Sequence, residues 1–170
     1  MNTFALAATW SLLVLANSPT ALAAEAGKKD TAPPDTSATL AKNYGGKVWV
    51  DGQGAPPGAD QLKTWLAENK QAAELARKGP DDPWTLNYVA VFKKAAARGP
   101  MTVWFYDKAD PKYIVDQCSS ENEAASVVSK GSCDLDPDHG FNKGRSYLVK
   151  VGQIINGKFQ PYAAGEVKLK

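Results

Sequence analysis

The stretch Trp84-Thr85-Leu86-Asn87-Tyr88-Val89-Ala90-Val91-Phe92, residues 84–92, decides the fold class because its pattern has a period of two. Every second side chain from Trp84 to Phe92 is apolar, and in an extended chain these side chains point to one face. Residues 101–107 show a second alternation after the turn Arg98-Gly99-Pro100. Alternation of this kind is typical of β-strands with one buried face.

Further strand signals recur at intervals of about ten residues, as in antiparallel β proteins. They cover residues 47–50, 113–118, 126–129, 147–151 and 159–169. Asn156-Gly157 lies between the last two and is typical of a type I′ hairpin turn. Pro161 cannot donate a backbone hydrogen bond, so it predicts a sheet edge or a bulge. We expect a mainly β fold, an antiparallel β-sandwich of six or seven strands over residues 84–169.

One N-terminal helix is expected over residues 60–78. Leu62, Trp65 and Leu66 recur with alanines at a spacing of three to four, Asp60 can cap the start, and Gly79-Pro80 ends the pattern. The apolar stripe and the mixed charges favour packing against the sheet over membrane-surface or partner binding. We expect this helix to cover the sheet face that contains Trp104 and Tyr106.

The first residues predict export. Residues 1–24 carry no charged side chain before Glu25, and an apolar run is followed by Ala21-Leu22-Ala23, which fits a signal-peptidase site. The run is too short to span a membrane. We therefore expect a signal peptide at 1–23, a disordered linker at 24–43 and one domain at 44–170, in a periplasmic or secreted protein.

The only two cysteines are Cys118 and Cys133. In an exported protein such a pair predicts a structural disulfide. The alternative, a redox-active pair, lacks the short spacing of a C-x-x-C motif.

Residues 135–169 resemble the penultimate-strand region of immunoglobulin-like and fibronectin-III-like sandwiches, through Leu135, Pro137 and the run from Phe141 to Val151. In those domains a tyrosine hydroxyl bonds back to the backbone at a corner between the sheets. The resemblance implies this role for Tyr147. It implies an architecture and no activity, because unrelated functions share such folds.

No site of known chemistry is evident. Asp134, Asp136 and Asp138 have the spacing of calcium ligands, but His139 and Arg145 stand where an EF-hand needs glycine and glutamate. A solvated turn is therefore favoured over a calcium site. His139 is the only histidine, so neither a zinc site nor a serine–histidine–acid site is expected. We predict no cofactor, no metal and no catalytic residue.

Aromatic residues leave one candidate site. Trp104 and Tyr106 share the face opposite Val103 and Phe105, which would give a platform for sugar or peptide if the helix did not cover it. A net charge of +2 is too small for a nucleic-acid-binding protein. We expect a non-catalytic exported module that binds a protein or glycan. The alternative is a small exported hydrolase with an unrecognised site.

Overall fold

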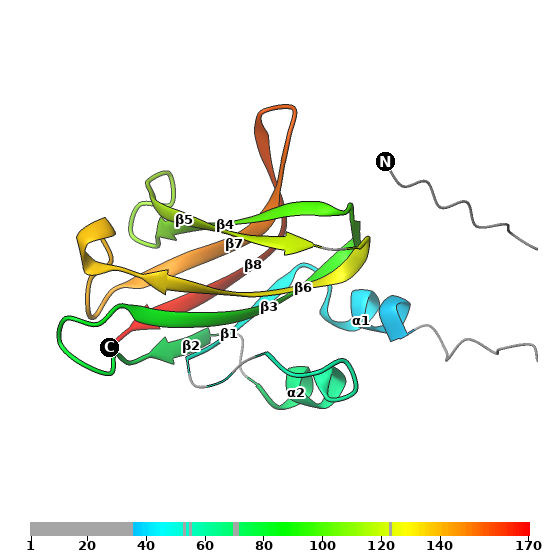
Figure 1. Ribbon diagram of the computed structural model, residues 1–170, viewed down its shortest axis with the longest axis horizontal. Helices are drawn as coiled ribbons and strands as arrows, with labels where there is room; N and C mark the ends of the chain where they lie inside the picture. The colour runs from blue at the N-terminus through cyan, green and yellow to red at the C-terminus, as the bar shows by residue number, and fades with distance from the viewer. Residues whose placement is uncertain (1–35, 53, 55, 70–71, 123) are drawn as a thin grey trace, which may run out of the picture. The chain divides into compact units, whose positions relative to one another are not determined.

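A computed structural model describes residues 36–52, 54, 56–69, 72–122 and 124–170 (Figure 1). The expected signal peptide and most of the expected linker lie outside the described residues. The helices are α1 (Thr36–Tyr44), α2 (Leu62–Glu68) and the 3-10 turn η1 (Pro137–His139). The strands are β1 (Lys47–Asp51), β2 (Ala72–Leu75), β3 (Trp84–Ala96), β4 (Gly99–Asp107), β5 (Ile114–Asn122), β6 (Ser126–Leu135), β7 (Ser146–Ile155) and β8 (Lys158–Leu169).

The strands form one sheet in the order β5-β4-β7-β8-β1-β3-β6, and β2 pairs with β8 beside this path. Most pairs are antiparallel, but β1 and β2 both run parallel to β8. The mainly β prediction is confirmed. The strands nevertheless form a single mixed, nearly barrel-shaped sheet, where two antiparallel layers were expected. The difference arises because β8 pairs with three strands, β7, β1 and β2. It thereby joins strands from the N-terminal and C-terminal halves of the domain in one sheet.

The two outermost strands of this path, β5 and β6, approach each other and are joined covalently. Cys118 on β5 and Cys133 on β6 form a disulfide with a Cα–Cα distance of 6.1 Å, which confirms the predicted pairing. No ladder of backbone hydrogen bonds joins residues 114–122 to 126–135. Side chains therefore close the sheet where backbone pairing stops.

Tyr88 makes a second link across the same gap. Its hydroxyl lies 2.6 Å from the Ser120 hydroxyl on β5, although Tyr88 itself belongs to β3. The ring reaches β5 by passing over Gly131 of β6, where an added Cβ would lie 2.8 Å from a ring carbon. Gly131 is thus required for close approach, because any larger side chain would occupy the space that the tyrosine ring fills.

The main core lies inside the curved sheet. It is lined by alternate, fully buried side chains of the long strands, which is the arrangement that their period of two predicts. The largest of these side chains are Trp84, Tyr88, Phe92, Phe105 and Tyr147, and Phe141 adds a sixth large side chain from the loop before β7.

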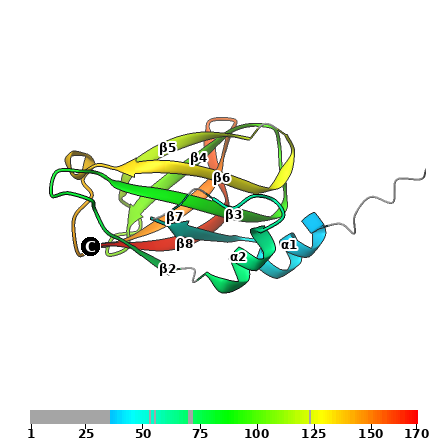
Figure 2. The same cartoon turned by 60° about the horizontal axis from the view of Figure 1, so that its bottom comes forward.

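A second apolar cluster lies on the outer face of β1 and β3, where both helices pack (Figures 1 and 2). Leu40 of α1 and Leu62 and Leu66 of α2 bury against side chains of the sheet: Trp49, Val89 and Val91. The run from Tyr88 to Phe92 is therefore buried on both faces, as is common in strands covered on both sides. Neither helix in the described part of the chain is long and apolar enough to cross a membrane.

The predicted helix over 60–78 is wrong in length and in placement. It ends at Glu68, where Asn69 turns extended and its side chain binds the Trp65 carbonyl at 2.7 Å. Residues 72–75 instead form β2, since pairing with β8 and burial of Leu75 outweigh the helix propensity of alanine and glutamate. Gln61, without a side-chain cap, holds the N-cap position expected for Asp60.

The helix also covers a different face from the one expected. α2 packs on β1 and β3, not on Trp104 and Tyr106, because Trp49, Val89 and Val91 offer it an apolar outer face. The expected linker differs as well. Its last residues from Thr36 onward belong to α1, whose Leu40 is buried in the outer cluster.

Replacing Gly131 by alanine should destabilise the domain by about 1–3 kcal/mol, because the new methyl group would overpack against Tyr88. Urea unfolding followed by circular dichroism measures this change. Gly58→Ala is the matched control, since an added Cβ there meets nothing within 4 Å and should be neutral or slightly stabilising. Equal stabilities of the two variants would contradict the close packing of Tyr88 on Gly131.

Candidate functional site

Trp104 and Tyr106 lie on the outer face of β4, with their side chains directed away from the main core. In the neighbouring strand β7, Lys150 pairs with Trp104 and Leu148 pairs with Tyr106. Directly paired residues share a face of the sheet, so these four side chains form one outer surface. This position on the outer face agrees with the alternation in the sequence.

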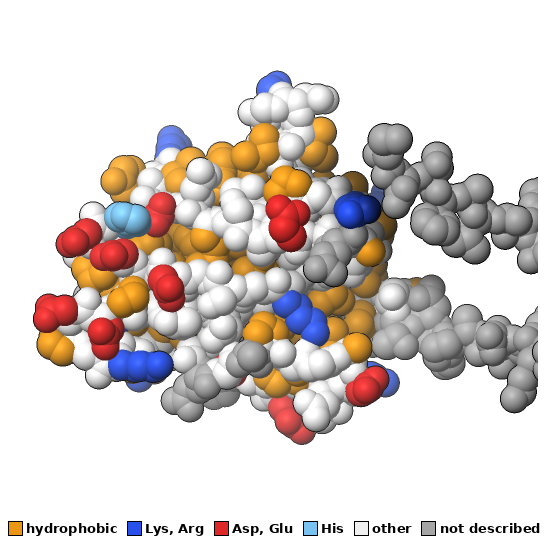
Figure 3. Space-filling view, viewed as in Figure 1, with side chains coloured by type: hydrophobic (Ala, Val, Ile, Leu, Met, Phe, Trp, Pro, Cys, Tyr) orange, Lys and Arg blue, Asp and Glu red, His pale blue; other side chains and the backbone are white. Residues whose placement is uncertain are grey.

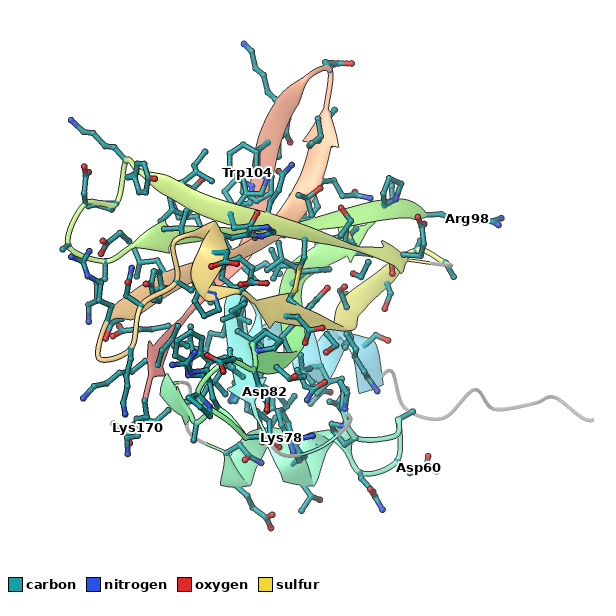
Figure 4. The ribbon with its side chains drawn as sticks, turned by 60° about the vertical axis from the view of Figure 1, so that its left-hand side comes forward. Asp60, Lys78, Asp82, Arg98, Trp104 and Lys170 are labelled. Carbon is teal, nitrogen blue, oxygen red and sulfur yellow. A yellow bond between two sulfur atoms is a disulfide. The ribbon has the colours of Figure 1, made fainter. Side chains whose placement is uncertain are left out.

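Trp104 is packed against the β7–β8 hairpin. Its ring stacks on Phe159, with centroids 4.2 Å apart and planes inclined by 15°. Its indole N–H is buried without a hydrogen-bond partner in the part of the chain that the structure describes. Figure 4 shows Trp104 at the base of this hairpin. The candidate platform is therefore joined to a second aromatic residue from β8.

A bulge in the hairpin brings Phe159 to Trp104. The register between β7 and β8 shifts at Gly152, which pairs with Pro161, as the proline predicted. An added Cβ on Gly152 would lie 2.0 Å from the Gln160 carbonyl oxygen, so only glycine allows the strands to approach this closely. The bulge bends the strand pair, and the hairpin rises away from the sheet (Figure 1).

The base of the hairpin is held by buried polar contacts. The Gln153 side chain donates to the Ala97 carbonyl at 3.1 Å and accepts from the Tyr162 hydroxyl at 3.3 Å. Asn156 and Gly157 at the tip have φ of 52° and 74°, as expected for a type I′ turn. The hairpin is thus anchored on one side by Gln153 and on the other by Phe159.

The part of the hairpin beyond these anchors exposes aliphatic side chains. Ile154 is 54% exposed and Ile155 is 37% exposed. Ile154 pairs with Phe159 and shares its face of the hairpin, whereas Ile155 points to the opposite face. We call Trp104, Ile154, Ile155 and Phe159, taken over both faces of the hairpin, the hairpin surface. Figure 3 shows hydrophobic side chains on this hairpin and around its base. Large aliphatic groups held in water on a projecting element mark a candidate contact site.

Tyr106 contributes little accessible area. It is only 8% exposed, and the Lys150 ammonium lies 4.2 Å above its ring. Burial raises the pKa of the Tyr106 phenol above its usual value, so the hydroxyl stays protonated at neutral pH. With the Tyr106 ring covered by Lys150 and one face of Trp104 covered by Phe159, stacking on a sugar ring is hindered.

Two of the three aspartates weighed as calcium ligands make other contacts through their side chains. Asp134 accepts a hydrogen bond from the Thr85 hydroxyl at 3.0 Å, and Asp136 accepts from the Asp138 backbone N–H at 2.9 Å, which caps η1. His139 is exposed and lies 3.1 Å from Asp116. Within the described ranges, no group of three or more His, Cys, Asp or Glu residues could hold a metal ion.

Charged groups also line a pocket of about 450 Å³ at the start of β7. Its acid, Asp107, pairs with Arg145, and Lys108 pairs with Glu166 at 2.6 Å. The Asp107 carboxylate also accepts the Ala109 N–H at 2.9 Å. These groups neutralise one another and hold the loop, so the pocket offers no evident pair of acid and base for catalysis.

Sequence patterns did not identify the contribution of the hairpin. Asn156-Gly157 correctly predicted the turn, yet the exposed isoleucines before it were not singled out. The available signal was the pair Ile154-Ile155 directly before the Asn156-Gly157 turn. The end of a strand at a hairpin tip has no neighbouring layer to cover both of its faces, so at least one of two consecutive aliphatic side chains there is exposed.

Addition of millimolar calcium should leave the melting temperature unchanged within about 1 °C, because a ligand stabilises a fold only by binding it. Thermal unfolding with calcium and with a chelator tests this directly. A rise of several degrees that Asp136→Asn abolishes would show that the aspartates converge on an ion.

The Tyr147 side chain makes the contact that the immunoglobulin-like resemblance implied. Its hydroxyl accepts a hydrogen bond from the Asn142 N–H at 2.7 Å and donates to the Gly140 carbonyl at 3.4 Å. The hydroxyl thus bonds back to the backbone, while the resemblance itself stays a prediction. No family model matches the chain, and the comparisons with curated proteins and with solved structures give no match.

Proposed function

We propose that this chain is an exported, non-catalytic β module that binds a partner protein through the hairpin surface. The observation that carries the proposal is the exposure of Ile154 and Ile155 on a projecting hairpin with a fixed base. Burial of an exposed isoleucine in an interface contributes about 1.5–3 kcal/mol. A rigid element also loses little conformational entropy on binding.

The chemistry of the hairpin surface favours a protein over a glycan as its partner. Sugars bind proteins largely by stacking on open aromatic faces, and here Phe159 covers one face of Trp104. The exposed groups are aliphatic, which suits an apolar pocket of another protein. Ile114 at the start of β5 pairs with Tyr106 and adds a further exposed apolar side chain beside the same outer face.

Export is supported by the N-terminal sequence pattern and by the disulfide. The bond between Cys118 and Cys133 is favoured in the periplasm or outside the cell. We also propose that residues 135–169 are related to the immunoglobulin-like sandwiches, and the Tyr147 contact supports this relationship.

A photoreactive amino acid placed at position 154 should form one major adduct with an envelope or secreted protein, whereas the same group at position 64 should not. Thr64 is the matched control because it is exposed on α2, away from the hairpin. Cross-linking in the producing cells, followed by mass spectrometry, identifies the adduct.

Ile154→Asp should reduce recovery of this partner at least about tenfold, since an interface residue worth 1.4 kcal/mol changes affinity by that factor. Thr64→Asp should leave recovery unchanged. The melting temperature of both variants should stay near that of the parent chain, because both positions are exposed. Equal adducts at positions 154 and 64, or capture of only a second copy of this chain, would contradict the proposal.

A further inference from the structure

Four cationic residues from three distant segments line one pocket at the C-terminal end of β8. The pocket has a volume of about 410 Å³, and its lining residues are Ala76, Arg77, Lys78, Gly79, Pro80, Lys143 and Lys170. It shares no residue with the hairpin surface. Figure 4 labels Lys78 and Lys170, which lie in the same lower part of the domain.

Buried Trp84 fixes two walls of this pocket. The Arg77 guanidinium lies 4.3 Å from the centroid of its ring, and its indole N–H donates to the Lys170 carbonyl at 3.0 Å. Trp84 is 1% exposed, so it is held by the core. The Arg77 guanidinium and the Lys170 backbone are thereby positioned by a rigid residue, and the Lys170 ammonium pairs with Glu74.

Backbone hydrogen bonds attach the third wall, which carries Lys143. The Gly144 N–H donates to the Leu169 carbonyl at 2.7 Å, and the Leu169 N–H donates to the Arg145 carbonyl at 2.9 Å. On the other side, the Lys170 N–H donates to the Leu75 carbonyl at 2.7 Å. The three segments that carry the cations are therefore held together before any ligand binds.

Acidic side chains offset part of this positive charge. Glu74 pairs with Lys170 and, at 3.7 Å, with Lys168. The carboxylate of Asp82 lies beside Gly79, which is one of the residues that line the pocket. Arg77, Lys78 and Lys143 form no ion pair with a carboxylate in the described residues. The cations that remain unpaired repel one another, and a bound anion relieves this repulsion.

We propose that this pocket binds the phosphate or sulfate group of a small molecule. The planar guanidinium of Arg77 can donate two parallel hydrogen bonds to such an oxyanion. Lys78 and Lys143 can add charge from the other sides. A volume of about 410 Å³ is in the range of small-molecule sites and exceeds what a free ion fills. A phosphate ester therefore fits the pocket better than free phosphate.

Isothermal titration of the full mature chain at low ionic strength tests the proposal, with glycerol phosphate, inorganic phosphate and acetate as probes. Glycerol phosphate should bind saturably and more tightly than inorganic phosphate, and acetate should bind weakest. If inorganic phosphate binds more tightly, the pocket is still an oxyanion site, but its ligand is the free ion. If acetate and both phosphates bind equally, the proposal is wrong.

Variants distinguish the pocket from general attraction to a basic surface. Lys143→Gln and Arg77→Lys should each weaken glycerol phosphate binding about three- to tenfold, the latter because lysine keeps the charge but loses the two-pronged geometry. Lys63→Gln, on exposed α2, is the control and should change the affinity by less than about twofold. If the control and Lys143→Gln weaken binding equally, or neither does, the proposal is wrong. Unchanged circular dichroism of Lys143→Gln would confirm that the variant folds.

Discussion

The bond between Cys118 and Cys133 joins the two strands at which the sheet would otherwise end. An open edge exposes unpaired backbone groups and invites association with other chains. Here β5 and β6 face each other, so the disulfide and the contact of Tyr88 with Ser120 close the gap from inside. The curvature imposed by this closure encloses the main core, because all the long strands then present one face to a common interior.

Closure also determines which outer faces remain available. The outer side of β1 and β3 is apolar and is covered by α1 and α2. Neither described helix packs on the outer side of β4 and β7, where the bent β7–β8 hairpin packs through Phe159. The hairpin surface and the cationic pocket therefore occur where the sheet is left uncovered and where its strand ends meet.

Local patterns predicted those features that depend on neighbours in sequence. The alternation in residues 84–92 predicted the strand, Asn156-Gly157 predicted the turn, and Pro161 predicted a bulge or an edge. Each of these patterns constrains the backbone only within a few residues, so the rest of the fold is not needed to interpret it. The end of α2 and the strand β2 could not be predicted, since pairing with β8 overrides local preference. The same limit applies to both candidate sites. Trp104 meets Phe159 only through the bulge, and Arg77 and Lys143 line one pocket because both of their segments bond to the end of β8.

Amide hydrogen exchange in the oxidised and the reduced protein tests most directly whether the disulfide closes the sheet. If it does, reduction should accelerate exchange in β5 and along β6 near Cys133, while the amides shared by β7, β8 and β1 keep their protection, because local opening exposes only the strands that it frees. Unchanged exchange in β5 and β6 after complete reduction would contradict this role and would mean that side-chain packing alone closes the sheet.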